Sequence, residues 1–247
     1  MTPKQLFQSG KLNEAITALG AELRDNPTDV KRRTFLFEML CFAGEYDRAE
    51  KHLNLLSDQG PQAKLGAVLY VASLHAERLR QDMFRKGDFP SGRTPVAPEK
   101  ISGTLNGQAF ESFEDADPRI GTTLEIFAAG AYLWIPMEHI VSIEMAAPKR
   151  LRDLMWIPAL VRTGPAFKDK ELGEVLIPAI SPLSSDEEDP NIKLGRVSEW
   201  REKEEGPVPV GLKNFLADGE DFPILEVRKI EFQIAAETLT AGQSGGE

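Results

Sequence analysis

Residues 10–27, GKLNEAITALGAELRDNP, are matched 34 positions later by residues 44–61, GEYDRAEKHLNLLSDQGP. The two segments share a glycine at the start, an alanine five residues on and a proline at the end. A period of 34 residues is that of the tetratricopeptide repeat, in which each repeat is a helix–turn–helix unit. Glycine suits the tight turn between two helices, and proline suits the end of the second one. We therefore predict helical repeats in the first part of the chain.

The repeat pattern also predicts where helices lie and how they pack. Ala15 and Ala49 hold the small-residue position, where two helices cross too closely for a larger side chain. The expected helices span residues 3–9, 12–25, 29–43, 46–58 and 61–86.

The last of these helices carries an apolar stripe with alternating spacings of four and three residues. The stripe consists of Leu65, Leu69, Ala72, Ala76, Leu79 and Met83, with Val68 and Val71 beside it. We expect this face to cap the repeats. At least three stacked repeats are normally needed to bury a continuous core, and the chain has about two and a half. We therefore expect the helices to lean on the second domain.

The helical composition ends at a segment rich in glycine and proline. Five such residues fall between Gly87 and Pro98, a density that no continuous helix or central strand tolerates. The predicted division is a tetratricopeptide-like helical domain at 1–86, a linker at 87–100, a mixed α/β domain at 101–238 and a disordered tail at 239–247.

Beyond the linker, short apolar runs replace the helical pattern. With few helical stretches between them, they fit a small antiparallel sheet or partly closed barrel better than a parallel sheet. Extended segments are expected at 104–110, 124–129, 132–136, 141–145, 155–162, 174–179 and 224–234, with a helical turn at 150–154 and an exposed acidic loop at 181–190. The predicted fold class is α+β: antiparallel tetratricopeptide-like repeats followed by a small mixed, mainly antiparallel β domain.

Composition and charge exclude several classes of function. The 247 residues carry 29 basic and 39 acidic side chains, a net charge of −10, and the pI is about 5.0. Because nucleic-acid binding relies on neutralising phosphates, we expect no nucleic-acid partner. The absence of an 18-residue apolar run and of a signal-peptide-like start predicts a cytoplasmic protein without membrane insertion. The lone Cys41 cannot form an internal disulfide and is expected to be a small buried residue.

The charge is unevenly distributed between the two parts. Residues 1–100 carry 15 basic and 13 acidic side chains, for +2, whereas residues 101–247 carry 14 and 26, for −12. A nearly neutral helical part joined to an acidic part favours a partner segment that is amphipathic and basic. The carboxylates of Asp186 to Asp189 are expected to add a modest, salt-sensitive contribution to such binding.

Four motifs follow one another in the second part of the chain. They are Gly130-x-Tyr132-x-Trp134-x-Pro136, Pro148 followed by Leu151-Arg-Asp-Leu154 and Trp156-x-Pro158-Ala159, Leu176-x-Pro178, and Leu194-Gly-Arg196 followed by Trp200. In order and spacing this set resembles the ImpE family, which is also called TagJ, over about residues 5–205. Ser198 and Glu199 depart mildly from the family pattern, where a threonine and an aspartate are expected.

This resemblance implies an accessory component of the bacterial type VI secretion system, with helical repeats ahead of a mixed α/β part. It implies a cytoplasmic adaptor that contacts the small subunit of the contractile sheath through the amino-terminal helix of that subunit. It also implies that the adaptor acts in the neighbourhood of ClpV, the unfoldase that recycles contracted sheaths. The resemblance supplies no catalytic residues.

The sequence contains no recognisable catalytic or metal-binding motif. It lacks the phosphate loop, the dinucleotide fingerprint, the H-E-x-x-H pair and the nucleophile elbow. His52, His75 and His139 share no short spacing, and the run from Asp186 to Asp189 lacks the EF-hand pattern. We therefore predict no catalytic residues, no metal and no cofactor.

Two alternative hypotheses stand beside the adaptor. The first is an enzyme with a site in the second domain, built from Arg152, Asp153, Glu138 and His139. The second is a sensor in which the β domain binds a small molecule or peptide and the repeats report it.

Aromatic and charged residues of the second part are the candidates for partner binding. Such residues anchor many protein interfaces because they bury a large area at low entropic cost. The candidates are Tyr132, Trp134, Arg152, Asp153, Trp156, Arg196 and Trp200. The alternative is structural: the two strand aromatics can face the core, and Arg152 with Asp153 can form a buried polar pair. The helical repeats are expected to provide a groove for the apolar face of the partner helix.

Overall fold

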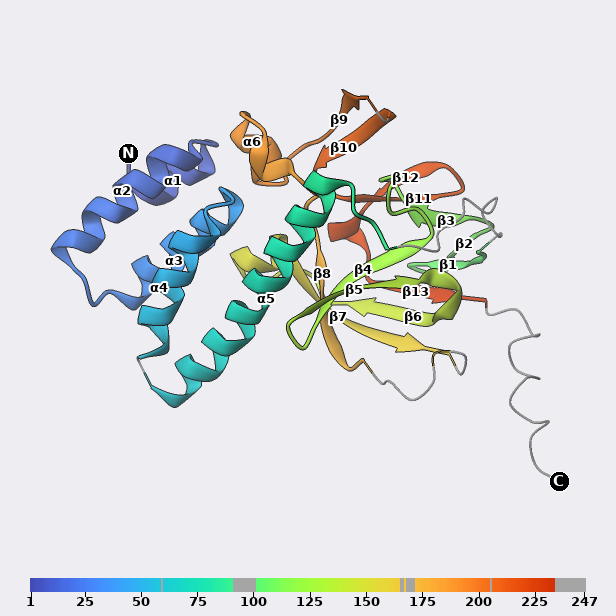
Figure 1. The fold of residues 1–247 in the computed structure, drawn as a ribbon, viewed down its shortest axis with the longest axis horizontal. Coiled ribbons are helices and arrows are strands. Elements are labelled where there is room, and N and C mark those ends of the chain that lie inside the picture. Colours follow the sequence, from blue (N-terminus) through green and yellow to red (C-terminus); the bar gives the residue numbers. More distant parts are fainter. Residues whose placement is uncertain (59, 91–100, 165–166, 168–171, 205, 234–247) are drawn as a thin grey trace.

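Five helices form the amino-terminal part of the computed structural model, which describes residues 1–58, 60–90, 101–164, 167, 172–204 and 206–233 (Figure 1). They are α1 (Pro3–Gln8), α2 (Leu12–Asp25), α3 (Val30–Phe42), α4 (Tyr46–Ser57) and α5 (Pro61–Lys86). All five predicted helices are confirmed, and no end differs from its prediction by more than one residue. The side chains of Thr2 and Asp29 cap α1 and α3 by accepting hydrogen bonds from backbone N–H groups.

The glycines and alanines of the repeat occupy the positions that their residue types predict. Gly10 and Gly44 lie between paired helices with φ angles of +79° and +74°, which residues with a Cβ rarely adopt. Ala15 and Ala49 are completely buried. A larger side chain at either alanine would therefore overpack the contact between two helices.

The second part is built on an eight-stranded sheet in which every pairing is antiparallel. Its strand order is β2-β1-β13-β6-β7-β8-β4-β5. The strands are β1 (Gly103–Leu105), β2 (Gln108–Phe110), β4 (Thr123–Ala128), β5 (Ala131–Pro136), β6 (Ile140–Met145), β7 (Trp156–Thr163), β8 (Glu174–Pro178) and β13 (Lys229–Phe232). The predicted mainly antiparallel β domain is thus confirmed. The single strand expected at 104–110 is a hairpin, because Asn106 and Gly107 turn the chain with positive φ angles.

Two smaller sheets and several short helices complete this part. The strands β3 (Phe113–Asp115), β11 (Asn214–Ala217) and β12 (Glu220–Pro223) form one sheet, and β9 (Ser198–Lys203) with β10 (Gly206–Gly211) forms a hairpin. The short helices are η1 (Met137–His139), η2 (Leu151–Leu154), η3 (Ser184–Asp186), α6 (Pro190–Lys193) and η4 (Ile224–Glu226). The sequence predicts no strand between 198 and 223, because the SEWREK segment is charged and the GPVPVG segment contains two prolines.

The prediction for the buried face of α5 is wrong in part. Ala76 of the expected apolar stripe is buried, but Leu69 and Leu79 are exposed, and so is Val68 beside them. The buried residues of this helix are a mixture of apolar, polar and charged side chains: Ala67, Ser73, Leu74, Ala76, Glu77, Arg80, Gln81 and Phe84. The reason is that α5 packs against α4 on one side and against β5 on the other. Its buried charges are stabilised by partners from the sheet, which periodicity does not reveal.

The apolar core consists of two clusters. The first lies within the β part and includes Leu124, Ile143, Ile177, Phe215 and Ile230. The second is shared by both parts of the chain, because Leu40 and Leu74 of the helices belong to the same cluster as Phe127, Trp156 and Leu194. The helices therefore pack against the second part of the chain, as their small number of repeats predicts.

Three sequence-based predictions fall outside the described residues. Most of the expected linker, at 91–100, lies there, and so do the expected tail at 239–247 and Ile234 at the end of the last expected strand.

Candidate functional site

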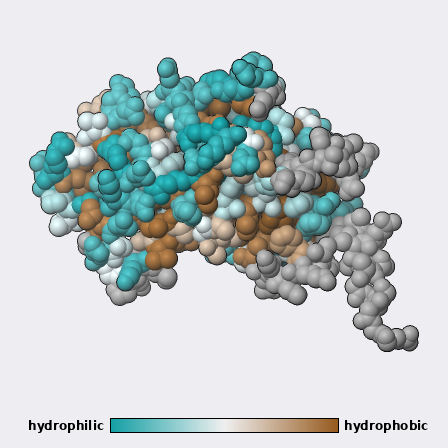
Figure 2. Space-filling model, viewed as in Figure 1, coloured by the Kyte–Doolittle hydropathy of each residue, from teal (hydrophilic) through white to brown (hydrophobic). Residues whose placement is uncertain are grey.

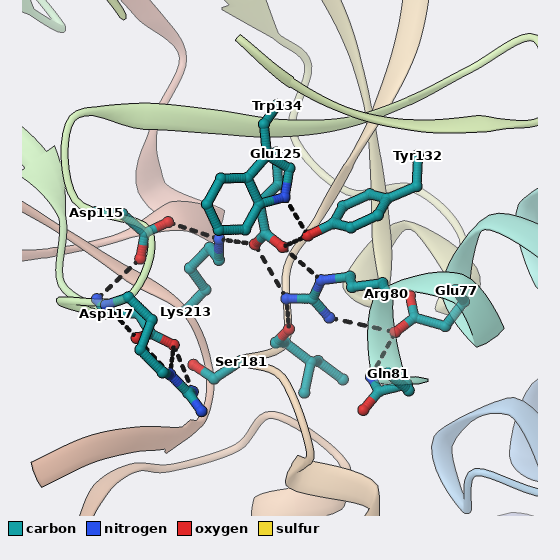
Figure 3. A network of polar contacts seen from close by, with 12 residues as sticks. Glu77, Arg80, Gln81, Asp115, Asp117, Glu125, Tyr132, Trp134, Ser181 and Lys213 are labelled. Atoms are coloured by element: carbon teal, nitrogen blue, oxygen red, sulfur yellow. Dashed lines mark hydrogen bonds and ion pairs between the residues drawn. The ribbon is translucent and has the colours of Figure 1, made fainter. Parts of the chain in front are cut away.

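A buried cluster of charged side chains lies where α5 meets the sheet, and Glu125 of β4 is at its centre (Figure 3). Arg80 of α5 donates two hydrogen bonds to the Glu125 carboxylate, from Nε at 2.8 Å and from Nη2 at 3.1 Å. Lys213 pairs with the same carboxylate and, at 2.6 Å, with Asp115. All four side chains are almost completely buried. A buried charge cluster is tolerated only when its members are paired in this way.

Three aromatic side chains extend this cluster. The Tyr132 hydroxyl donates to Glu125, and Trp134 Nε1 donates to the Tyr132 oxygen. On the helical side, Arg80 also binds Glu77 at 3.2 Å, and Glu77 accepts a hydrogen bond of 2.9 Å from Trp156 Nε1. The predicted partner-binding residues Tyr132, Trp134 and Trp156 thus lie at the junction between helices and sheet.

The electrostatics of the cluster follow from burial and pairing. Burial disfavours the charged form of Glu125, but Arg80 and Lys213 outweigh that effect and hold the pKa of this carboxyl well below its usual range. Burial raises the pKa of Asp115 to about 6, and Lys213 offsets the effect only in part. Burial and the neighbouring Glu125 raise the pKa of Tyr132 far above its usual value, so its hydroxyl remains a donor. Oppositely charged groups at the junction thereby hold the two parts together.

The inner face of the repeats, formed by α3 and α5, is covered by the second part of the same chain. A small cavity of about 20 Å³ separates Cys41 and Phe42 of α3 from Met155 and Ile180. Trp156 packs in the same apolar cluster and is only 2% exposed, so a partner cannot reach it without separating the two parts. The inner face of the repeats is therefore covered by the protein itself and, among the described residues, offers no open groove for the predicted partner helix.

The turns of the repeats are held by the acidic segment that follows β8. A Cβ added at Gly44 would lie 2.8 Å from Ser185 Cβ, so the turn is in contact with η3. Arg85 of α5 pairs with Asp186 at 3.0 Å. Ser181 and Ser184 are buried. The expected exposed loop at 181–190 is therefore wrong for its first half, because that half is packed against the helices.

Arg152 and Asp153 do not form the polar pair that the sequence suggests. Asp153 accepts hydrogen bonds of 2.9 Å from the backbone N–H groups of Lys149 and Arg150, and so closes the turn of η2. The Arg152 guanidinium lies 4.5 Å from the centre of the Tyr70 ring. Its buried Nε has no hydrogen-bond partner among the described residues. These residues brace η2 against α5 and do not face each other.

The four residues of the enzyme hypothesis lie in two separate short helices, η1 and η2. His139 lies 3.5 Å from Glu138 within η1. Within the described residues, no hydrogen bond or ion pair links this pair to Arg152 or Asp153 in η2. No cluster of three or more metal-binding side chains occurs in the described part of the chain.

The other two candidate residues, Arg196 and Trp200, lie outside the junction. Arg196 donates to the backbone carbonyls of Phe7 at 2.7 Å and Gln8 at 3.2 Å, and thus ties the segment after α6 to α1. Trp200 of β9 is 49% exposed. Of the seven candidates, this is the large aromatic side chain most open to a partner.

An exposed apolar surface lies over the amino-terminal half of α5. Val68 and Leu69 are 61% and 52% exposed. The turn between β4 and β5 adjoins them, since a Cβ added at Gly130 would lie 3.3 Å from Ala72 Cβ. Ala129 and Ala131 in this turn are exposed too. We call Val68, Leu69, Ala72 and residues 129–131 the α5 surface. In Figure 1 the amino-terminal half of α5 lies at the lower edge of the molecule, and Figure 2 shows apolar residues along that edge in the same view.

Sequence reasoning misses both the charged cluster and the α5 surface. One available signal for the cluster is Glu125, a lone charge between Leu124 and Ile126 in an otherwise apolar strand. Another is the spacing of Glu77, Arg80 and Gln81, which puts three polar groups on one face of a helix. Their partners Asp115 and Lys213 carry no such signal, because only the tertiary fold brings them close.

These features define a class of protein: tetratricopeptide-like helices joined to an antiparallel β domain through a buried ionic junction. Comparison with known families agrees with both halves of this description. The tetratricopeptide repeat family matches residues 6–69, and the family described as ImpE protein matches residues 107–231, which is half of the chain. The chain belongs to the ImpE protein family.

Two individual proteins resemble the chain over almost its whole length. The type VI secretion system accessory component TagJ of Pseudomonas aeruginosa is 26% identical over 270 residues, which cover 94% of this chain and 92% of that protein. A crystal structure of a Vibrio parahaemolyticus protein superposes with a TM-score of 0.81 at 21% identity and covers 96% of this chain and 99% of that one. The second likeness supports the fold. Among the described residues, no helix is both long and apolar enough to cross a membrane.

Proposed function

We propose that this protein is a non-catalytic, cytoplasmic adaptor of the type VI secretion system. In this proposal it binds the amino-terminal helix of the small sheath subunit, close to the step at which ClpV recycles contracted sheaths. The similarity to TagJ along nearly the whole chain supports a role in this system. The tetratricopeptide-like helices support a protein as the partner, because such repeats commonly present extended surfaces to other chains.

The observation that carries the proposal is the α5 surface. In a tetratricopeptide array, each first helix of a repeat packs against a second helix, and α5 holds the place of a first helix in a third repeat. The described chain continues from α5 into strands and supplies no second helix. The sheet covers α5 near Arg80 and Phe84 but leaves Val68 and Leu69 open to solvent. A helix from a partner can dock there and take the place of the missing one.

The physics of this docking favours an amphipathic helix. An apolar face laid against Val68, Leu69 and Ala72 would remove these side chains from water, at about 1.5–3 kcal/mol for each large one. Lost rigid-body freedom and the ordering of the partner helix offset part of this gain. We therefore expect a dissociation constant in the micromolar range. We place the groove expected on the repeats at the open side of α5.

The test is isothermal titration of the full-length protein with a peptide that spans the first helix of the small sheath subunit. The double variant Val68→Glu with Leu69→Glu should weaken binding at least tenfold, because it places two charges under the apolar face. The matched control is Val30→Glu, which adds a charge at an exposed valine in the first turn of α3. Equal weakening by the control would show that charge alone is responsible.

Two further outcomes decide between the parts of the proposal. Wild-type binding by the double variant would remove the α5 surface from the proposal. Failure of the wild-type protein to bind both this peptide and the intact sheath subunit would overturn the adaptor function itself.

A further inference from the structure

The three tryptophans of the chain lie in different environments: two are inside the junction and one is half exposed to solvent. Trp134 and Trp156 donate their indole N–H groups to Tyr132 and Glu77 inside the junction. Trp200 is half exposed, and its side chain makes no hydrogen bond and no aromatic or cation–π contact with any described residue. Tryptophan is costly to leave in water and is enriched among residues that anchor protein interfaces.

The hairpin of β9 and β10 holds Trp200 in a defined place. Trp200 is paired across the hairpin with Pro209, and Glu202 is paired with Pro207. Because side chains alternate along a strand, Trp200 and Glu202 project from the same face, beside the two prolines. We call the exposed part of this face, Trp200, Glu202 and Pro207, the hairpin surface, since Pro209 is buried. On the opposite face, Arg201 pairs with Glu199 at 2.8 Å and with Glu187 at 2.9 Å, which ties β9 to the segment after η3.

The surroundings of Trp200 are acidic, and three of the carboxylates there are not paired within the described chain. Residues 186–204 contain seven carboxylates and four basic side chains. Three of the basic side chains are already engaged: Lys193 with the Ser185 carbonyl, Arg196 with α1, and Arg201 with two glutamates. Glu188, Glu202 and Glu204 have no ion-pair partner among the described residues.

We propose that the hairpin surface binds a basic segment of a protein partner, with a lysine or arginine of that segment stacked on the Trp200 indole. A cation over the face of a tryptophan is attracted by the ring, and nearby carboxylates strengthen the attraction. Glu202 supplies a carboxylate on the same face of β9 as the ring, and Glu204 adds negative charge at the end of the strand. The same acidity opposes a phosphate-bearing ligand and disfavours a second copy of this chain, whose net charge is also negative.

This surface is separate from the α5 surface. Figure 1 places the hairpin beyond α6 at the upper edge of the view and the amino-terminal half of α5 at the lower edge. The protein can therefore hold a basic segment at one end while a helix occupies the other. Such an arrangement suits an adaptor that links two protein chains, but the hairpin proposal does not depend on which helix docks on α5.

The experiment uses the full-length protein labelled with ¹⁵N and a twelve-residue peptide of alternating arginine and alanine. The three tryptophans give three indole N–H resonances, and the Trp200 resonance is assigned by its loss in Trp200→Phe. We expect the peptide to shift the Trp200 resonance and leave the two buried indoles unchanged. A peptide with glutamine in place of arginine should give no shift.

Variants then separate the ring from the charge. Trp200→Ala should weaken binding of the arginine peptide about three- to tenfold, as the loss of a partly desolvated cation–π contact predicts. Glu202→Gln with Glu204→Gln should weaken it and reduce its dependence on salt. The matched control, Glu174→Gln with Glu220→Gln, makes the same change of net charge at two exposed glutamates elsewhere and should have no effect.

Several results would overturn the proposal. They are an unshifted Trp200 resonance at millimolar arginine peptide, undiminished binding by Trp200→Ala, and equal loss in the control variant. A Trp200-dependent dimer in sedimentation experiments would instead assign the ring to self-association. Unchanged binding of the sheath helix in Trp200→Ala would keep this outcome distinct from the adaptor function.

Discussion

The core of the β part and the junction between helices and sheet are both buried, yet they consist of different kinds of side chain. The first is a cluster of aliphatic and aromatic side chains such as Ile143, Phe215 and Ile230. The second combines apolar packing with the buried charges of Arg80, Glu125 and their partners. Apolar packing tolerates small changes of geometry, whereas a buried ion pair is stable only when its partners are in place. The junction therefore fixes how the two parts are joined.

The largest effect is expected from breaking the ionic junction. Glu125→Gln keeps the shape of the side chain but leaves Arg80 and Lys213 without their shared anion. Removing one member of a buried ion cluster costs about 3–5 kcal/mol, so the free energy of unfolding should fall by about that amount. Urea unfolding measures it, with Glu220→Gln on exposed β12 as the control. A loss below about 1 kcal/mol would show that the junction is not held by its charges.

A smaller effect is expected inside the helical repeats. Ala49→Leu forces a larger side chain into a completely buried contact and should lower the free energy of unfolding by about 1–3 kcal/mol. Lys51→Leu, at an exposed position of the same helix, is the matched control. Equal stability of the two variants in thermal or urea unfolding would contradict a tight helix contact at Ala49.

The helices also contain a pH-dependent weak point at Glu38. Burial raises the pKa of this carboxyl to about 7, and Arg152 offsets the effect only in part. Because the folded-state pKa is above the usual value of about 4.3, this group destabilises the fold increasingly as pH rises from about 4 to about 7. Glu38→Gln mimics the neutral form and should add about 1–2 kcal/mol of stability at pH 8 but almost none at pH 4. Thermal unfolding across this range tests it, and equal effects at both pH values would be inconsistent with the raised pKa.

The smallest effect is expected at the exposed rim of the junction between the helices and the second part of the chain. Arg85 and Asp186 join α5 to η3, but both side chains are about half exposed. Ion pairs in water contribute about 0.2–1 kcal/mol and are screened by salt. Arg85→Ala should therefore change the stability far less than Glu125→Gln, and the difference from wild type should vanish in 1 M salt. A loss that persists at high salt would point to packing by the arginine stem.

Most of the architecture, but not the junction, could be predicted from the sequence. The 34-residue repeat, with Gly10 and Gly44 in the turns, locates all five helices, because each feature is local. Strands β9 to β12 are missed because charge and proline hide their alternation. The face of α5 is predicted wrongly because burial of Arg80 depends on Glu125, a residue 45 positions away. A periodic pattern cannot reveal a partner brought near by the fold.

The roles of the candidate partner-binding residues also depend on the tertiary fold. Aromatic residues beside prolines and turns suggest an interface, but Tyr132 and Trp134 satisfy hydrogen bonds within the chain. Trp200 lies in the charged segment SEWREK and is half exposed. Its exposure and the lack of a side-chain hydrogen bond to any described residue distinguish it from the others, and neither can be predicted from the sequence.

Hydrogen exchange of the full-length protein, with and without the peptide of the first sheath-subunit helix, tests most directly where the partner binds. Docking on the α5 surface predicts slower exchange in the amino-terminal half of α5 and in the turn at residues 129–131. The hairpin of β9 and β10 should exchange as before. Protection confined to the β part, or no protection at peptide concentrations far above micromolar, would contradict the proposed role of α5.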